Sequence, residues 1–129
     1  MFTYQAKLID VIDGDTVDLI IDLGFGVHVK ERCRLYGIDA PEMPSEQGKI
    51  AKAYLESLLN AATGEIFVAT RKMTRKPREK TDKYGRYLAV LYDGSHHIDI
   101  DVEESSLNMM QGSINFAMVY TGHAKERYW

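Results

Sequence analysis

Carboxylates and arginines in three short motifs are the residues of this sequence best suited to chemistry. Asp15 lies in an Asp-Gly-Asp-Thr motif. Arg34, Asp39 and Glu42 share the stretch Arg-Leu-Tyr-Gly-Ile-Asp-Ala-Pro-Glu, and Arg86 ends Thr-Asp-Lys-Tyr-Gly-Arg. Carboxylate oxygens are the ligands that hard cations such as Ca²⁺ prefer, and guanidinium groups donate two parallel hydrogen bonds to phosphate oxygens. Acids, a hard cation and arginines together predict hydrolysis of phosphodiester bonds.

Length and composition describe one ordinary folded domain, spanning residues 1–129. The chain has 129 residues, of which 45% are hydrophobic and 27% charged. No apolar run reaches the ~20 residues of a membrane helix, so we expect no membrane partner. The N-terminus lacks a signal-peptide pattern, which predicts either a cytoplasmic protein or one whose export signal has been removed, and Met1 favours the first. Cys33 is the single cysteine and is interpreted as a packing residue.

Basic residues are concentrated in one segment, although the net charge is −3. Residues 70–86 contain eight of the sixteen lysines and arginines in the chain, against two acids. A focused basic segment can bind a polyanion on a protein that is acidic as a whole. Its alternative interpretation is a solvated loop, but it runs directly into the motif that ends at Arg86.

Hydrophobic periodicity predicts a small β-barrel with two helices. Apolar and polar residues alternate in the first third of the chain, which is the period of half-buried strands. The predicted strands are 5–12, 15–24, 27–37, 65–71 and 86–92, and the predicted helices are 45–61 and 114–121. Five strands with a helix after the third favour a closed or nearly closed barrel of the kind that binds oligonucleotides. The fold class is therefore mainly β with α (α+β).

The segment 95–113 is predicted to add a short strand and a short helix to this barrel. Residues 97–102 alternate strictly between polar and apolar types, and residues 105–111 precede a glycine that would end a helix. Two interpretations stay open, an oligomer interface and a loop extension.

The three motifs, in this order and at this approximate spacing, resemble the signature stretches of the staphylococcal nuclease (thermonuclease) family. The resemblance covers about residues 6–94 and resumes over 114–125. It implies an OB-fold, a five-stranded β-barrel packed with helices. It also implies a nuclease that depends on one Ca²⁺ ion and cleaves single- or double-stranded DNA and RNA with little sequence preference. Water would attack phosphorus and the 5′ oxygen would leave, giving 3′-phosphate ends.

The resemblance further implies a set of roles at the metal. Asp15 and Asp39 match calcium ligands, and Ala40 matches a residue that gives a backbone carbonyl oxygen. Glu42 matches the proposed general base. Three carboxylates are too few for a two-metal site, which agrees with a single ion.

The remaining matches concern the substrate. Arg34 and Arg86 match catalytic arginines, which would bind the phosphate more tightly as its charge grows toward the transition state. Lys83 and Tyr84 match positions that hold a terminal phosphate, and Tyr128 matches a tyrosine near the nucleotide base. The alternative is a non-catalytic OB-fold module that binds nucleic acid or protein, although every matched catalytic position is filled here.

Overall fold

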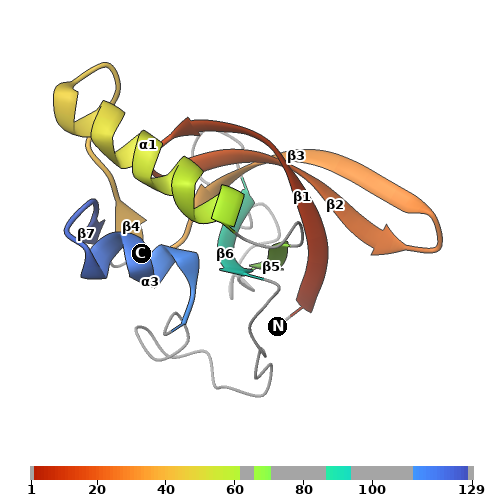
Figure 1. Cartoon of the computed structure of the whole chain (residues 1–129). Helices are drawn as coiled ribbons and strands as arrows, with labels where there is room; N and C mark the ends of the chain where they lie inside the picture. Colours follow the sequence, from red (N-terminus) through yellow and green to blue (C-terminus); the bar gives the residue numbers. More distant parts are fainter. Residues whose placement is uncertain (1, 62–65, 71–86, 94–111, 128–129) are drawn as a thin grey trace.

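The computed structural model describes residues 2–61, 66–70, 87–93 and 112–127, and it shows a β-barrel covered by two helices (Figure 1). The strands are β1 (Phe2–Asp13), β2 (Thr16–Gly24), β3 (Val27–Leu35), β4 (Ile38–Asp39), β5 (Ile66–Thr70), β6 (Tyr87–Asp93) and β7 (Lys125–Glu126). The helices are α1 (Glu46–Ala61) and α3 (Ile114–Tyr120).

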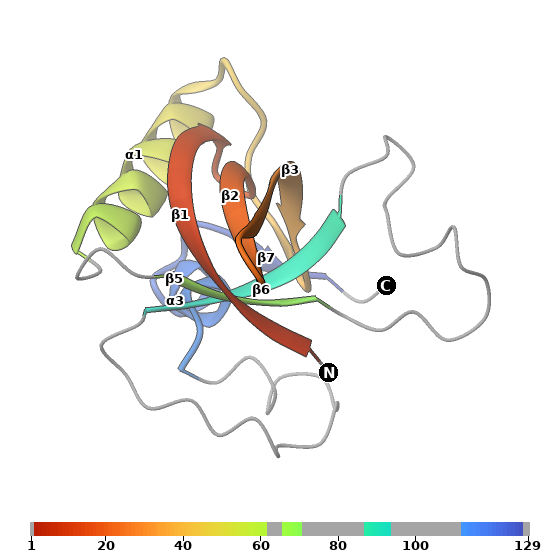
Figure 2. The same cartoon turned by 90° about the vertical axis from the view of Figure 1, so that its right-hand side faces the viewer.

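Five of the strands close into a barrel in the order β1-β2-β3-β6-β5, with β5 returning to β1 (Figure 2). Neighbouring strands are antiparallel except for β3 and β6, which run parallel. The predicted OB-type barrel and its five strands are confirmed. The small sheet formed by β4 and β7 was not predicted, because two-residue strands leave no periodic pattern in a sequence.

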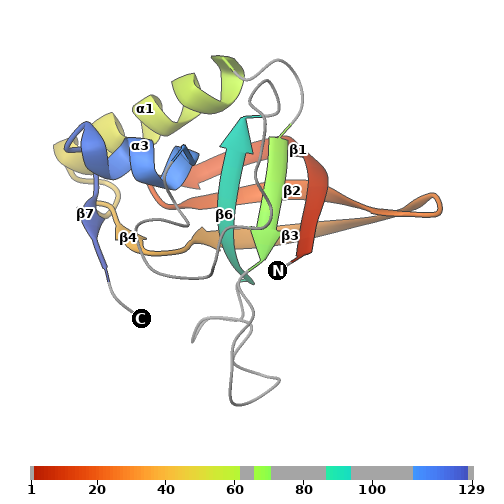
Figure 3. The ribbon, with the colours of Figure 1, turned by 90° about the horizontal axis from the view of Figure 1, so that it is seen from below.

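Alternation along the strands explains the barrel interior. Val17, Leu19 and Ile21 of β2 point inward and are buried, and Cys33 and Leu35 of β3 continue the same core. The distal halves of β2 and β3 extend beyond the barrel as a two-stranded ribbon (Figure 3). The predicted packing role of Cys33 agrees with its place in this core.

The helices lie where their apolar stripes predict. Helix α1 packs against β1 and α3, and it buries Ala51, Leu55 and Leu59. Ser45 caps its start, because the Ser45 hydroxyl accepts a hydrogen bond from the Gly48 N–H at 3.0 Å. Ser113 caps α3 in the same way, through the N–H of Phe116. The ring of His123, just after α3, stacks on Tyr54 of α1 with 3.9 Å between the ring centroids.

Asn115 joins α3 to the barrel through buried hydrogen bonds. Its side-chain oxygen accepts from the N–H of Leu91 at 3.0 Å, and its amide nitrogen donates to the carbonyls of Tyr36 at 2.9 Å and Ala89 at 3.0 Å. Asn115 is completely buried. Asn115 of α3 therefore bonds to both the β3–β4 connection and β6, and its removal would take a hydrogen bond from each of three backbone groups.

Several predictions fall outside the described residues. These are the strand and helix of segment 95–113 with its proposed oligomer interface, and the site residues Lys83, Tyr84, Arg86 and Tyr128. Within the described residues, no helix is both long enough and apolar enough to cross a membrane.

We predict that Asn115→Ala lowers the free energy of unfolding by about 2–4 kcal/mol, because it removes three buried hydrogen bonds, among them the bond from the Leu91 N–H. Urea denaturation followed by circular dichroism measures this. Tyr120→Ala, at an exposed position of the same helix, is the control and should change stability by less than about 1 kcal/mol. Equal effects of the two substitutions would contradict the role given to Asn115.

Candidate active site

Asp15 lies in the tight turn between β1 and β2. The Asp13 carboxylate accepts a hydrogen bond from the Asp15 N–H at 3.0 Å, which is the local bond that Asp makes in turns. The Asp15 carbonyl accepts from the Leu35 N–H at 2.8 Å, so the turn is fixed to the end of β3. Gly14 lies tightly against its neighbours, since a Cβ there would be 2.7 Å from the Cβ atoms of Ala40 and Ala51. Only glycine lets this turn approach α1 so closely.

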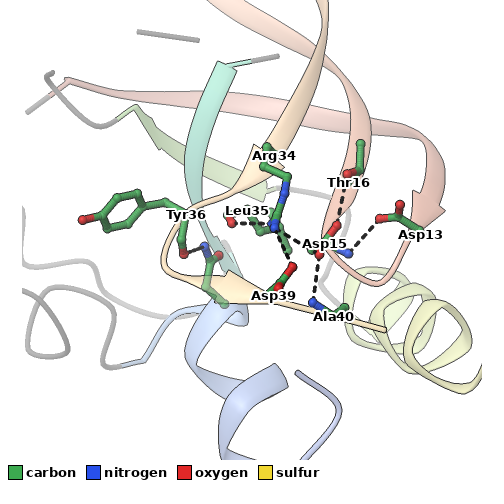
Figure 4. Close-up of polar contacts among 9 residues, drawn as sticks. Asp13, Asp15, Thr16, Arg34, Leu35, Tyr36, Asp39 and Ala40 are labelled. Carbon is green, nitrogen blue, oxygen red and sulfur yellow. Dashed lines mark hydrogen bonds and ion pairs between the residues drawn. The ribbon is translucent and has the colours of Figure 1, made fainter. Parts of the chain in front are cut away.

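Arg34 is the centre of the site and lies at the end of β3 (Figure 4). Its Nη1 donates to the Leu35 carbonyl at 3.1 Å. Its Nη2 lies 3.3 Å from Asp15 Oδ2 and 3.2 Å from Asp39 Oδ1. The side chains of Arg34 and Asp15 are 5% and 9% exposed, whereas that of Asp39 is 57% exposed. One guanidinium nitrogen thus joins a buried acid to an acid at the surface.

The Asp15 carboxylate has further partners. Its Oδ2 also accepts from the Ala40 N–H at 2.8 Å, and its Oδ1 accepts from the Thr16 hydroxyl at 3.2 Å. The pKa of Asp15 is nevertheless raised to about 6, chiefly by burial and then by a hydrogen bond with the Asp13 carboxyl, against the lowering effect of Ala40 and Arg34. The buried carboxylate is therefore only partly neutralised by the protein, and a second cation beside it would favour its charged form.

The structure brings some of the predicted site residues together and not others. Asp15, Arg34 and Asp39 meet, and Ala40 joins them through its N–H group. The Glu42 side chain is exposed, and no hydrogen bond or ion pair joins it to any other described residue. Among the residues placed by the structure, no three side chains of His, Cys, Asp or Glu form a group that could hold a metal. Three acids were expected to meet at one point. Two of them, Asp15 and Asp39, are joined by Arg34, and Glu42 makes no contact of this kind within the described part of the chain.

The sequence analysis gave no site role to Asp13 or Gly14. Asp13 lies against Asp15 and raises its pKa, and Gly14 allows the turn to pack on Ala40 and Ala51. The Asp-Gly-Asp spacing could have indicated the role of Asp13, since an Asp side chain in a turn often accepts a hydrogen bond from the N–H two residues later. No local pattern indicates the second, because the packing partners of Gly14 lie far away in the chain.

The residues fit a hard cation by the chemistry of their donor atoms. Carboxylate oxygens of Asp15 and Asp39 both contact Nη2 of Arg34. Ala40, whose backbone carbonyl is the expected third donor, is the next residue after Asp39. Oxygen donors of this kind suit Ca²⁺ better than softer metals. Since only Asp39 is substantially exposed, an arriving ion would reach the site from the side of Asp39.

The barrel and its site define a small α+β domain of the OB-fold type with a nuclease-type fold. The sequence model of the family described as "Staphylococcal nuclease homologue" matches residues 32–129, which is most of the chain. The chain belongs to this family, and the resemblance seen in the motifs is confirmed.

Three curated proteins are similar over most of this chain. Protein ParB of Escherichia coli is 29% identical over 93% of the chain and 55% of its own length. Micrococcal nuclease of Shigella flexneri is 26% identical over 92% of the chain and 61% of its own length. An uncharacterised protein of Bacillus anthracis is 30% identical over 75% of the chain and 42% of its own length. The chain thus spans about half the length of these relatives.

We predict that Asp15→Asn changes the pH dependence of stability in metal-free buffer. A carboxyl whose folded pKa is about 6 and whose ordinary value is 3.8 binds its proton more tightly in the folded state. The stability that Asp15 contributes is present below pH 3.8 and is lost as the pH rises through 6. An amide escapes this loss, so relative to wild type the variant should gain about 1–3 kcal/mol between pH 4 and pH 8. Urea denaturation at each pH measures the difference.

Asp18→Asn is the control and should have the opposite sign. The hydrogen bond from Arg32 lowers the pKa of Asp18, so its contribution to stability is present at neutral pH and is lost as the pH falls. Asp18→Asn should therefore cost stability at pH 7 and cost less at acid pH. A relative gain by Asp18→Asn at pH 8 like that expected of Asp15→Asn would contradict the argument from burial.

Proposed function

We propose that this protein is a Ca²⁺-dependent endonuclease that hydrolyses DNA, RNA or both with little sequence specificity. The observation that supports it best is Arg34 near the end of barrel strand β3, where a buried acid and an exposed acid both pair with it. A relative that carries the name micrococcal nuclease and the family membership of the chain agree with this activity. The working metal and the preferred nucleic acid are determined by the experiments below.

Asp15, Asp39 and the Ala40 carbonyl are the groups that would hold the calcium ion. When bound, the ion would neutralise the phosphodiester and assist the attack of water on phosphorus. Asp15 is the better fixed of the two acids, because three hydrogen bonds and an ion pair surround its carboxylate and its turn. Asp39 is the acid that meets solvent.

Arg34 would bind the non-bridging oxygens of the scissile phosphate. Its Nη1 is occupied by the Leu35 carbonyl and its Nη2 by two carboxylates, so the guanidinium plane is fixed before substrate arrives. A donor group that is already oriented stabilises the transition state without a further ordering cost. Glu42, exposed on the segment that follows β4, would accept the proton of the attacking water, and the 5′ oxygen would leave.

A second candidate function has its own support. Arg34 already forms ion pairs with both Asp15 and Asp39, an arrangement that can stabilise the barrel without any metal or substrate. In a non-catalytic module that binds nucleic acid or protein, these ion pairs would have a structural role alone. Cleavage by the purified protein separates the two functions.

The first test is hydrolysis of heat-denatured DNA and of RNA by the purified chain in Ca²⁺, in Mg²⁺ and in EDTA. We expect cleavage with Ca²⁺ and at least tenfold less in EDTA, with 3′-phosphate ends detected on end-labelled substrate. Salt-sensitive binding of the same DNA without cleavage in any metal, by a protein that is folded by circular dichroism, would favour the binding module instead.

We predict that Arg34→Lys lowers kcat by roughly 10²–10³-fold, because an ammonium group keeps the charge but loses the bidentate geometry. Arg32→Lys is the matched control two residues earlier on the same face of β3. The Arg32 side chain is 53% exposed and paired with Asp18, and its variant should keep kcat within about twofold. A nearly full rate for Arg34→Lys at unchanged stability would end the role given to this arginine.

A further inference from the structure

Gly48, in the first turn of α1, lies directly against the backbone of Glu42. A Cβ atom at Gly48 would be 2.3 Å from the Glu42 carbonyl oxygen and 2.7 Å from its carbonyl carbon. Both are backbone atoms, which cannot turn aside as the end of a side chain can. Gly48 has no positive φ, so space rather than backbone conformation requires glycine here. Glycine in a helix costs about 0.5–1 kcal/mol relative to alanine, so this contact is maintained against helix propensity.

Ser45 completes the connection between Glu42 and the helix. The Glu42 carbonyl accepts from the Ser45 N–H at 3.2 Å and from the Ser45 hydroxyl at 2.6 Å. The same hydroxyl accepts from the Gly48 N–H at 3.0 Å, and the Ser45 carbonyl accepts from Lys49 at 2.9 Å. The backbone of Glu42 is therefore bonded to the first turn of α1, although its side chain is exposed.

The same face of α1 also contacts the turn that carries Asp15. Ala51, three residues after Gly48, is buried against Gly14. Residues three apart on a helix lie on one face. Two close approaches on one short stretch of α1 thus set the distance between the Asp15 turn and the backbone of Glu42.

We propose that Gly48 and Ser45 are positioning residues for Glu42, and that the first turns of α1 align Glu42 with the Asp15 turn. This inference rests on the proposed nuclease function, because it assigns to Glu42 the removal of a proton from water. A methyl group at residue 48 displaces the Glu42 backbone and with it the carboxylate. The Asp15–Arg34–Asp39 arrangement does not contact Gly48 and should be preserved.

Gly48→Ala is the main test. We expect kcat to fall roughly 10- to 100-fold, since small misplacements of a catalytic group have effects of this size. KM and the Ca²⁺ concentration for half-maximal activity should stay within about twofold. The carbonyl ¹³C chemical shift of Glu42 in the metal-free protein should change, whereas that of Asp15 should not. A kcat within twofold of an active wild type would overturn the inference.

A double-mutant cycle shows whether Gly48 acts through Glu42. Gly48→Ala should lower the residual rate of Glu42→Gln by less than about twofold, because the carboxylate that it positions is already absent. Full multiplicative loss in the double variant would mean that alanine damages the domain in another way, and would overturn the inference. Thermal denaturation of every variant reports separately on folding.

Ser45 is tested with a matched serine of the same helix. Ser45→Ala should lower kcat, and Ser45→Thr, which keeps the hydroxyl, should restore most of it. Ser57→Ala is the control, because the Ser57 hydroxyl also bonds to a backbone carbonyl of α1, that of Tyr54 at 2.7 Å, but far from Glu42 in the helix. Equal effects of Ser45→Ala and Ser57→Ala would contradict the positioning role.

Absence of cleavage by wild type would instead overturn the proposed function, and the role of Glu42 with it.

Discussion

The ion pair between Arg34 and Asp15 is the interaction on which both the fold and the site depend. Both side chains are almost entirely removed from water, and a buried charge is tolerated only when it is paired and hydrogen-bonded. β3 supplies Arg34 and the β1–β2 turn supplies Asp15. The Ala40 N–H donates a further hydrogen bond to the Asp15 carboxylate. The β1–β2 turn must therefore meet the segment from Arg34 to Ala40 before the charges can be buried.

Small residues then decide how closely these parts approach one another. Gly14 lies between Ala40 and Ala51, and Gly48 lies under the carbonyl of Glu42. Larger side chains at these positions would separate α1 from the loops that carry the acids. The packing of α1 is consequently part of the site, although none of its side chains belongs to the proposed catalytic groups.

The barrel could be predicted from the sequence because its strands alternate regularly and its motifs keep the order of a known family. Strand ends follow the pattern less closely, because β1 begins at Phe2 rather than at residue 5. The bonds made by Asn115 could not be predicted, since an asparagine in a helix has many ordinary roles. The same holds for Gly48, whose partner is a backbone carbonyl and leaves no trace in residue types. Motifs identified Asp15, Arg34 and Asp39, whereas their sharing of one guanidinium nitrogen required the folded chain.

The unequal exposure of the two acids determines what a phosphate would meet at Arg34. Asp15 is enclosed and keeps its contact, so an incoming anion can compete only with Asp39 for Nη2. If it displaced Asp39 alone, the freed carboxylate would face the phosphate and repel it. Asp39 would offset that repulsion by holding a divalent cation, while the contacts with Asp15 and the Leu35 carbonyl would keep the guanidinium oriented toward the substrate. Under the proposed function, both acids would hold the ion, but their contacts with Arg34 differ: Asp15 would keep its contact with the arginine, and Asp39 would give up its contact when the ion binds.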